Sequence, residues 1–467
     1  MLLTLLYRRQ QRKKRHKKRD TLVDEGIVSA EIPPSQFPYV TVQLPIYNER
    51  HVALRLLDAV VQLDWPLHCL EIQVLDDSTD DTRELIATAV ADYARRGLPI
   101  THIQRSDRSG YKAGALENGM AQAKGDFIAI FDADFVPKPD FLQRLMPKFA
   151  DTAIGCVQAR WGHVNPNSSL LTQLQVLGID GHFVIQQETR DQIGAFFNFN
   201  GTAGIWRVQC IEDAGGWQHD TLTEDLDLSY RAQLKGWRIA YDGGVVVSAE
   251  LPVQIDAFKR QQFRWAKGSF QTAIKLIRRV WQSDNPLWRK ILGSIHLTNY
   301  AVHPLMLFNL LLILPMSWSN SRLIYYSPIL TIAALGPIFM YVTTLQTQAQ
   351  SFWGGAKRLI LLTALGTGLS VNNTRAVLEA IIGIPSEFKR TPKFAVVDQS
   401  TTWQQSSYRL PRNPILWLEI VLAIYALAIL IWKINTGMYW LVFWLIWYSG
   451  GYSYVAGLAL IQARRGR

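Results

Sequence analysis

The sequence FIAIFDADF, residues 127–135, is the clearest indication of fold class in this 467-residue chain. Its apolar run from Phe127 to Phe131 predicts a buried β-strand, and two carboxylates, Asp132 and Asp134, follow at once. Strand-like and helix-like runs alternate before it: strands at 39–46, 70–75 and 100–104, and helices at 48–63, 82–96 and 113–123. Alternation of this kind predicts a parallel sheet within an α/β domain.

Acidic residues stand at the ends of these predicted strands. Glu49 follows the first strand, Asp76 and Asp77 follow the second, and Asp132 and Asp134 follow the fourth. Ligands bind at the carboxyl ends of strands in open α/β sheets. Side chains at i and i+2 of an extended chain point to the same side, so Asp132 and Asp134 are expected to hold one Mg²⁺ or Mn²⁺ ion against a diphosphate. A solvated turn is the alternative interpretation, because Asp is common in turns.

A second acidic pair opens a predicted helix. Thr223, Glu224 and Asp225 precede the helical sequence LDLSYRAQLKGW. Asp225 is a candidate general base, and Thr223 is expected to cap the helix. The alternative is that the two carboxylates only complement the positive end of the helix dipole.

The sequence QQFRW, residues 261–265, falls on an amphipathic helix ahead of the apolar C-terminal third. Arg264 offers a bidentate fork to phosphate, and Trp265 offers a flat face to a sugar ring. An Arg and Trp pair is also typical of an anchor at a bilayer edge. The residues alone leave both interpretations open.

Charge is unevenly distributed along the chain, whose net charge is +11. Residues 8–19 hold nine Lys and Arg and no acid, residues 20–291 hold 27 basic against 34 acidic residues, and residues 292–467 hold 13 against 4. A chain that is 48% hydrophobic with three cysteines is neither largely disordered nor a disulfide scaffold. The basic run is expected to bind anionic membrane lipid, and no nucleic-acid partner is expected because no nucleic-acid-binding fold accompanies it.

Four apolar stretches are long enough to span ~30 Å of hydrocarbon, and they run over 292–316, 327–345, 414–432 and 438–460. Buried core helices are the alternative interpretation. A fifth stretch, 359–384, is interrupted by polar residues, and the basic links on either side of it are expected to be cytosolic. We therefore interpret it as a broken helix in the membrane interface, and Met1 to Tyr7 as the end of a longer spanning helix.

Seven motifs stand in order along residues 38–275: PIYNE, LDDSTDDT, GYKAGAL, FDADF, NFNGTAGIWR, TLTEDLDLSYR and QQFRW. With this set the chain resembles the family 2 inverting glycosyltransferases of the processive, cellulose synthase type. The connecting sequences LDWP, VQARW and AGGW are similar to the cellulose synthase-like A and C branch, whose members build mannan, glucomannan and glucan backbones. The resemblance implies a GT-A-type nucleotide-sugar-binding domain followed by an α-helical transmembrane domain.

The resemblance also implies roles for single residues. The residues implied around the nucleotide sugar are Pro45, Tyr47, Glu49, Asp77, Lys112 and Asp132. Asp132 and Asp134 would hold the metal ion, and Asn200, Gly201 and Thr202 would line the acceptor sugar. The implied catalytic residues are Asp225 as general base, the adjacent Glu224, and the group Gln261, Arg264 and Trp265 that steadies the leaving diphosphate and the acceptor end.

Phe388, Thr391 and Lys393 resemble the gating loop of cellulose synthases, in which Arg390 here replaces a valine. The expected organisation is a membrane-proximal polybasic segment at 1–37, a cytosolic GT-A domain at 38–291 and a transmembrane domain at 292–467, with the interfacial helix and gating-loop-like segment at about 359–413. Such a protein would be an integral protein of the cell (plasma or inner) membrane.

The implied reaction is hexosyl transfer from UDP-glucose or GDP-mannose to a growing β-linked glucan or (gluco)mannan. One alternative is a glycosyltransferase that makes a β-glycolipid on a membrane lipid acceptor. A non-enzymatic alternative is a channel or transporter with a nucleotide-sensing domain, in which the Asp225 and QQFRW sites would be idle.

Overall fold

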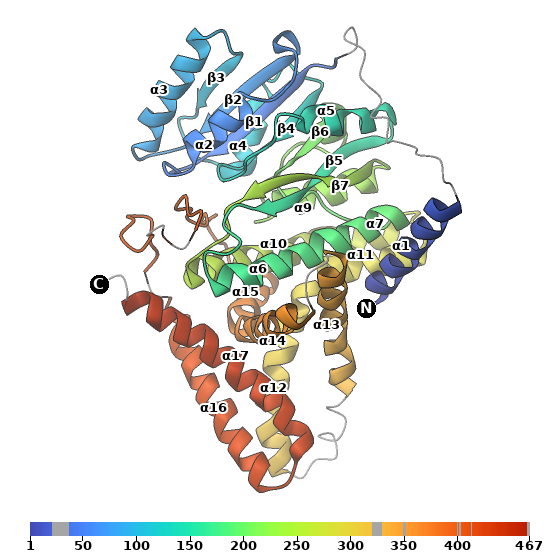
Figure 1. Cartoon of the computed structure of the whole chain (residues 1–467), viewed down its shortest axis with the longest axis vertical. Coiled ribbons are helices and arrows are strands. Elements are labelled where there is room, and N and C mark those ends of the chain that lie inside the picture. Colours follow the sequence, from blue (N-terminus) through green and yellow to red (C-terminus); the bar gives the residue numbers. More distant parts are fainter. Residues whose placement is uncertain are drawn as a thin grey trace.

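The computed structural model describes residues 1–20, 37–319, 329–348, 352–398, 400, 403–411 and 413–464. A seven-stranded sheet forms the upper part of the molecule, and long helices extend below it (Figure 1). The strands are β1 Val40–Ile46, β2 Leu70–Asp76, β3 Ile100–Gln104, β4 Phe127–Ile130, β5 Ile154–His163, β6 Gly204–Arg207 and β7 Arg238–Ala249. Their order across the sheet is β3-β2-β1-β4-β6-β5-β7.

The first four strands are parallel, as the alternating pattern predicts. β1 pairs with β2 and β4, and β2 pairs with β3. The expectation of a wholly parallel sheet is wrong for the remainder, because β6 runs antiparallel between β4 and β5. β6 has only four residues and therefore too few positions to show a period in the sequence. The sheet is mixed, and the carboxyl ends of β1, β2 and β4 still meet at one edge.

Helices cover both faces of the sheet and bury two apolar clusters against it. They are α2 Ala53–Val60, α3 Thr82–Arg95, α4 Tyr111–Met120, α5 Phe141–Leu145, α8 Val208–Asp213 and α9 Glu224–Leu234, with short 3₁₀ turns η2 Leu67–Cys69 and η3 Met146–Ala150. The helix expected from residue 48 begins later. Asn48 has a φ of +51°, outside the α-helical region, and its side chain accepts from Thr79 N at 2.8 Å, which holds the turn after β1 against the turn after β2.

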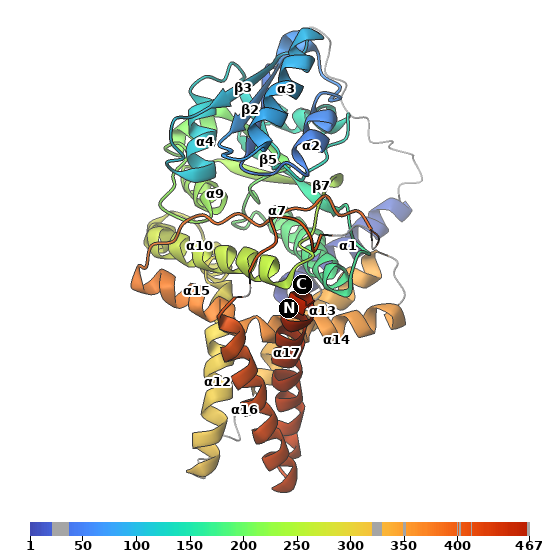
Figure 2. The same cartoon turned by 90° about the vertical axis from the view of Figure 1, so that its left-hand side faces the viewer.

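A layer of helices lies between the sheet and the apolar helices below it. It contains α6 Leu170–Asp180, the π-helical turn η4 Gly181–Gln187, α7 Glu188–Ile193, α10 Ile255–Gln282, α11 Leu287–Leu297, α14 Phe352–Gly368 and α15 Ser370–Ile382. Figure 2 shows α14 and α15 lying across the ends of the descending helices rather than alongside them. The break at Leu369 between α14 and α15 is the interruption expected within residues 359–384.

The descending helices occupy the four stretches expected to span a membrane. They are α12 Val302–Trp318, preceded by the 3₁₀ turn η5 Asn299–Ala301, then α13 Ile329–Thr347, α16 Ile415–Asn435 and α17 Tyr439–Arg464. Within the described residues, two segments are both long and apolar enough to cross a membrane: Asn299–Trp318 and Ile415–Asn435. The segment expected to start at residue 292 begins later, because hydrogen bonds hold α11 against the sheet domain. The Tyr230 hydroxyl donates to Gly293 O, and the Ser269 hydroxyl donates to Leu297 O.

The N-terminal helix α1, Leu2–Asp20, packs against α7, η4 and α13. Thr4 and Tyr7 are buried, and Thr189 donates to Leu3 O at 3.4 Å. Several basic side chains lie outside the described residues. They are those of the basic run beyond Lys13, together with Arg322, Arg412, Arg465 and Arg467 of the expected loops, links and C-terminal end.

Candidate active site

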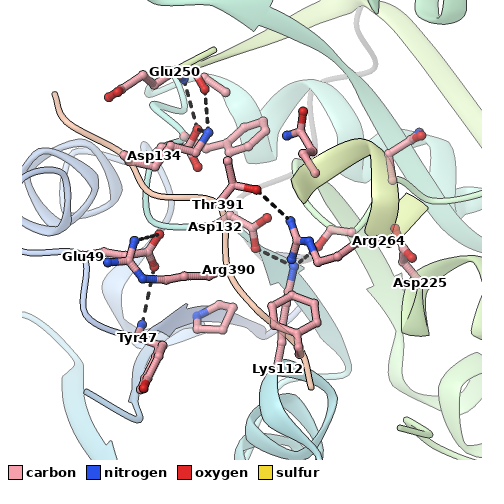
Figure 3. A pocket seen from close by; sticks show the side chains of 18 of the residues that line it. Tyr47, Glu49, Lys112, Asp132, Asp134, Asp225, Glu250, Arg264, Arg390 and Thr391 are labelled. Carbon is pink, nitrogen blue, oxygen red and sulfur yellow. Dashed lines mark hydrogen bonds and ion pairs between the residues drawn. The ribbon is translucent and has the colours of Figure 1, made fainter. Parts of the chain in front are cut away.

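A cleft of about 180 Å³ opens at the carboxyl ends of β1, β2 and β4. Figure 3 shows Asp132 near its centre, Tyr47, Glu49 and Arg390 on one side, and Arg264 and Asp225 on the other. The residues expected at the nucleotide, metal and catalytic sites all line it: Pro45, Tyr47, Glu49, Asp77, Lys112, Asp132, Asp134, Glu224, Asp225, Gln261, Arg264 and Trp265. The strand-end acids and the QQFRW helix therefore belong to one site.

Lys112 connects the first carboxylate of FDADF to the opposite wall of the cleft. It lies on α4 and donates to Asp132 Oδ1 at 2.5 Å and to Gly201 O at 2.9 Å. Its ammonium is also 3.8 Å from Glu224. The nearby carboxylates raise the pKa of Lys112 against the opposing effect of burial, so this lysine stays charged.

Asp134 has a different partner, supplied by the segment after α15. Lys393 Nζ donates to Asp134 Oδ2 at 2.7 Å and to Glu250 O at 2.5 Å. Glu250 N donates to the same oxygen of Asp134, and Phe394 N donates to the carboxylate of Glu250. Hydrogen bonds from Lys393 and Phe394 thereby fix the segment 388–394 beside Asp134 and Glu250.

Asp132 and Asp134 do not lie on an extended chain, so the expectation based on strand alternation is wrong in its geometry. Phe135 N donates to Asp132 O at 3.0 Å, which makes residues 132–135 a turn. Each carboxylate accepts a hydrogen bond from its own ammonium group, Asp132 from Lys112 and Asp134 from Lys393. No cluster of three or more His, Cys, Asp or Glu suited to a metal occurs among the described residues. The two carboxylates nevertheless offer oxygen donors, the ligand type that a hard cation such as Mg²⁺ or Mn²⁺ prefers.

The first turn of α9 presents the second acidic pair to the cleft. Burial and the neighbouring Glu224 raise the pKa of Asp225 to about 7, while Lys112 opposes the shift. Burial likewise raises the pKa of Glu224. Only Leu226 N donates to the Asp225 side chain among the described residues, at 2.8 Å. A partly buried carboxylate with so few partners is suited to accept a proton from a bound hydroxyl.

Thr223 does not cap α9, contrary to expectation. Its side chain makes no capping hydrogen bond; instead its hydroxyl lies 3.4 Å from that of Thr272 on α10. A Cβ on Gly268 would lie 2.5–2.6 Å from the Thr223 side chain, so α9 and α10 approach closely at this point. Packing between the two helices thus determines the Thr223 rotamer.

The QQFRW residues reach the cleft from α10. Arg264 Nη2 donates to Thr391 Oγ1 at 3.2 Å, and its guanidinium lies 4.4 Å from the ring centroid of Phe388. Gln261 and Trp265 line the same wall. Arg264 therefore contacts two of the gating-loop-like residues and faces the carboxylates Glu224 and Asp132.

Tyr47, Glu49 and Asp77 form the other end of the cleft. Burial raises the pKa of Glu49 to about 7, and Arg390, 3.9 Å away, opposes this shift. Arg390 also donates to Asn48 O. Asp77 accepts two hydrogen bonds from Arg105, so its carboxylate is held in place.

Asn200 and Gly201 line the cleft as expected, but Thr202 does not. Thr202 is fully buried, and its hydroxyl accepts from Asp132 N at 2.9 Å. It therefore fixes the backbone of Asp132 instead of forming a wall of the cleft. Four ionisable cleft residues were not predicted in these roles: Arg108, His163, Glu250, and Arg390 as a partner of Glu49. Only Arg108 has a local signal, its position just before GYKAGAL.

Residues 38–268 match the family model described as glycosyltransferase like family 2. The chain carries a family 2 glycosyltransferase domain. The sheet and helices that hold its cleft accordingly form an α/β domain of the GT-A type.

Two curated plant relatives match this domain. The chain is 43% identical over 267 residues to glucomannan 4-beta-mannosyltransferase 1 of Oryza sativa subsp. japonica, covering 56% of this chain and 51% of the relative. It is 42% identical over 267 residues to glucomannan 4-beta-mannosyltransferase 9 of Arabidopsis thaliana, covering 56% and 50%. The chain thus spans about half the length of the curated relatives it matches.

Among solved structures, the chain is similar to the mannosyltransferase PcManGT from Pyrobaculum calidifontis, solved in complex with GDP-Man and Mn²⁺. The TM-score is 0.49 at 22% identity, covering 74% of this chain and 88% of that one. Agreement at this level adds nothing to the assignment, which rests on the sequence match.

Proposed function

We propose that the chain is a membrane-bound inverting glycosyltransferase that transfers mannose from a nucleotide sugar to a growing β-linked, mannan-type polysaccharide. The proposal rests on one relationship: a Cβ on Gly201 would lie 3.1 Å from Asp225 Oδ2 and 3.5 Å from Lys112 Nζ. The candidate base and the cation that holds Asp132 therefore flank a single glycine. The relatives named above, both glucomannan 4-beta-mannosyltransferases, support the choice of sugar and product.

Asp225 removes the proton from an acceptor hydroxyl as that oxygen attacks the anomeric carbon from the face opposite the nucleotide. One displacement converts an α-linked donor into a β-glycoside. Lys112 and Arg264 are placed to stabilise the charge that develops on the departing diphosphate. Asp132 and Asp134 are the residues that would hold Mg²⁺ or Mn²⁺, which when bound neutralises diphosphate charge.

Membrane insertion of α12, α13, α16 and α17 is part of the proposal. On α16 the exposed apolar side chains recur at intervals of three and four residues: Trp417, Val421, Ile424, Leu427 and Ile431. This spacing places them on one outward face of the helix. An apolar face of this length is stable in lipid and costly in water. The family 2 domain would then lie on the cytosolic side with α14 and α15 in the interface.

Incubation of membranes containing the full chain with labelled GDP-mannose or UDP-glucose tests this function. We expect label from GDP-mannose in an insoluble product that a β-mannanase digests. Label that extracts into organic solvent would instead show a glycolipid product. Absence of transfer from either donor, by protein that binds both nucleotides, would favour the nucleotide-sensing channel or transporter.

A further inference from the structure

Two arginines that precede GYKAGAL use their guanidinium groups differently. Arg105 uses its donors within the chain: it donates to both oxygens of Asp77, to Ser109 O at 2.7 Å and to Tyr111 O at 3.0 Å. Within the described residues, the Arg108 side chain makes no hydrogen bond or ion pair, and its Nε is buried without a partner. Arg105 is therefore committed to the fold, whereas the donors of Arg108 remain available to a ligand.

Arg108 is nevertheless held firmly in place. Its Cζ lies 3.4 Å from the ring centroid of Tyr47, a separation that a guanidinium reaches only when stacked on the ring, and 5.0 Å from that of Tyr111. Tyr111 has a φ of +51°, which non-glycine residues rarely adopt, and its N–H donates to Arg108 O at 3.0 Å. Strained backbone of this kind persists where the surrounding structure fixes it, and it is concentrated at functional sites. The turn keeps the Tyr111 ring beside the guanidinium.

The position of Arg108 within the cleft limits what it can bind. Its charged neighbours are Asp77 and Arg105, at the end of the cleft that holds Tyr47. The diphosphate end has its own cations, Lys112 and Arg264, beside Asp132 and Glu224. Arg108 therefore faces the part of a nucleotide sugar that lies beyond its phosphates, namely the nucleoside.

We propose that Arg108 selects the base of the donor by donating two parallel hydrogen bonds to O6 and N7 of guanine. This inference rests on the proposed function and assigns its donor nucleotide. Stacking on Tyr47 directs the in-plane N–H groups of the guanidinium sideways, as a fixed fork. Guanine presents two adjacent acceptors to such a fork, and a bidentate Arg–guanine contact is a favourable pairing. Uracil has a donor, N3–H, between its two carbonyl oxygens and offers no adjacent pair.

Equilibrium binding by the purified full chain tests this inference without requiring turnover. Three ligands are compared by calorimetry with Mn²⁺ present: GDP, UDP, and 7-deaza-GDP, which lacks N7. We expect the wild-type protein to bind GDP about tenfold more tightly than either UDP or 7-deaza-GDP, within the range for one bidentate pair. In Arg108→Ala all three ligands should bind alike, at the wild-type affinity for UDP. Arg108→Lys, which has a point charge without the fork, should not restore the N7 dependence.

Arg96→Ala is the matched control, because the Arg96 guanidinium also lies over a tyrosine ring, that of Tyr93, but Arg96 does not line the cleft. It should retain every wild-type affinity. Equal binding of GDP and 7-deaza-GDP by the wild-type protein would overturn the inference. The inference would also be overturned if the Arg108→Ala protein kept its preference for GDP, or lost UDP binding as well, while its unfolding temperature stayed at the wild-type value. Failure of the wild-type protein to bind any of the three ligands would contradict the proposed function instead.

Discussion

Lys393 Nζ donates to Asp134 Oδ2 over 2.7 Å and joins two residues that are 259 positions apart. Lys112 holds Asp132 in the same manner, so both carboxylates of FDADF carry an ammonium partner. The segment that brings Lys393 also places Arg390 beside Glu49 and Thr391 beside Arg264. With this segment in place, the cleft has a volume of about 180 Å³. Small-molecule sites usually measure roughly 300–1,000 Å³, so binding of the proposed nucleotide-sugar donor would require this segment to shift.

Replacing Lys393 by Met is expected to raise the affinity of the nucleotide-free protein for Mn²⁺ about tenfold, because the ion no longer displaces a charge-assisted hydrogen bond. Electron paramagnetic resonance of free Mn²⁺ measures this directly. Lys389→Met changes an exposed lysine of the same segment and should leave the affinity unchanged. Equal or weaker Mn²⁺ binding by Lys393→Met would show that Lys393 does not compete with the metal ion.

Gly201→Ala is expected to reduce transfer about 100-fold or more, because misplacement of catalytic groups by ~1 Å has this effect. Its new Cβ would lie 3.1 Å from Asp225 Oδ2. Gly194→Ala is the control. Gly194 also has positive φ, +66° against +83° at Gly201, but its Cβ would meet nothing within 4 Å. Both variants carry backbone strain, so an equal loss of activity would attribute the effect to strain and not to Asp225.

The pH dependence of transfer should follow Asp225, whose pKa is raised to about 7. A general base acts only when deprotonated, so kcat/KM should rise as pH increases through about 7 and then level off. Glu49 has a pKa in the same range. The Glu49→Gln variant distinguishes titration of Asp225 from titration of Glu49. If Asp225 causes the rise in kcat/KM, the rise should persist in this variant. A profile that becomes flat in Glu49→Gln would assign the titration to Glu49.

Lys259 on α10 and Glu419 on α16 form a fully buried ion pair with an N–O distance of 2.6 Å. Removing one partner leaves the other charge buried and unpaired, which costs about 3–5 kcal/mol. Lys259→Met and Glu419→Leu should therefore each lower the thermal unfolding temperature of the detergent-solubilised protein. The double variant should recover most of this loss, because no lone charge remains. Additive destabilisation in the double variant would contradict coupling between the two residues.

The parts of the site that follow strands could be predicted, because a residue at the end of a buried strand has few possible positions. This holds for Glu49, Asp77, Asp132 and Asp134, which line the cleft as expected. The four parallel strands and the break between α14 and α15 were predictable for the same reason: their patterns are local. Thr223 shows the limit of such reasoning, since contact with α10 overrides a good capping sequence.

The remaining contacts depend on pairs that no local pattern reveals. Arg390 reaches Asn48 across 342 positions, and Phe394 reaches Glu250 across 144. Arg108 could not be predicted for a different reason: its proposed role depends on hydrogen bonds that its side chain does not make within the chain. Only the structure shows that Arg105 uses its donors internally while Arg108 does not.

Transfer by the Asp225→Asn variant tests whether Asp225 is the general base of the proposed reaction. The wild-type and variant proteins, in matched membranes, are compared for release of nucleotide diphosphate from GDP-mannose and for calorimetric binding of GDP with Mn²⁺. We predict that the variant binds GDP with wild-type affinity while its transfer rate falls at least 100-fold, the lower range for loss of a general base. Transfer at the wild-type rate by Asp225→Asn would contradict the assignment.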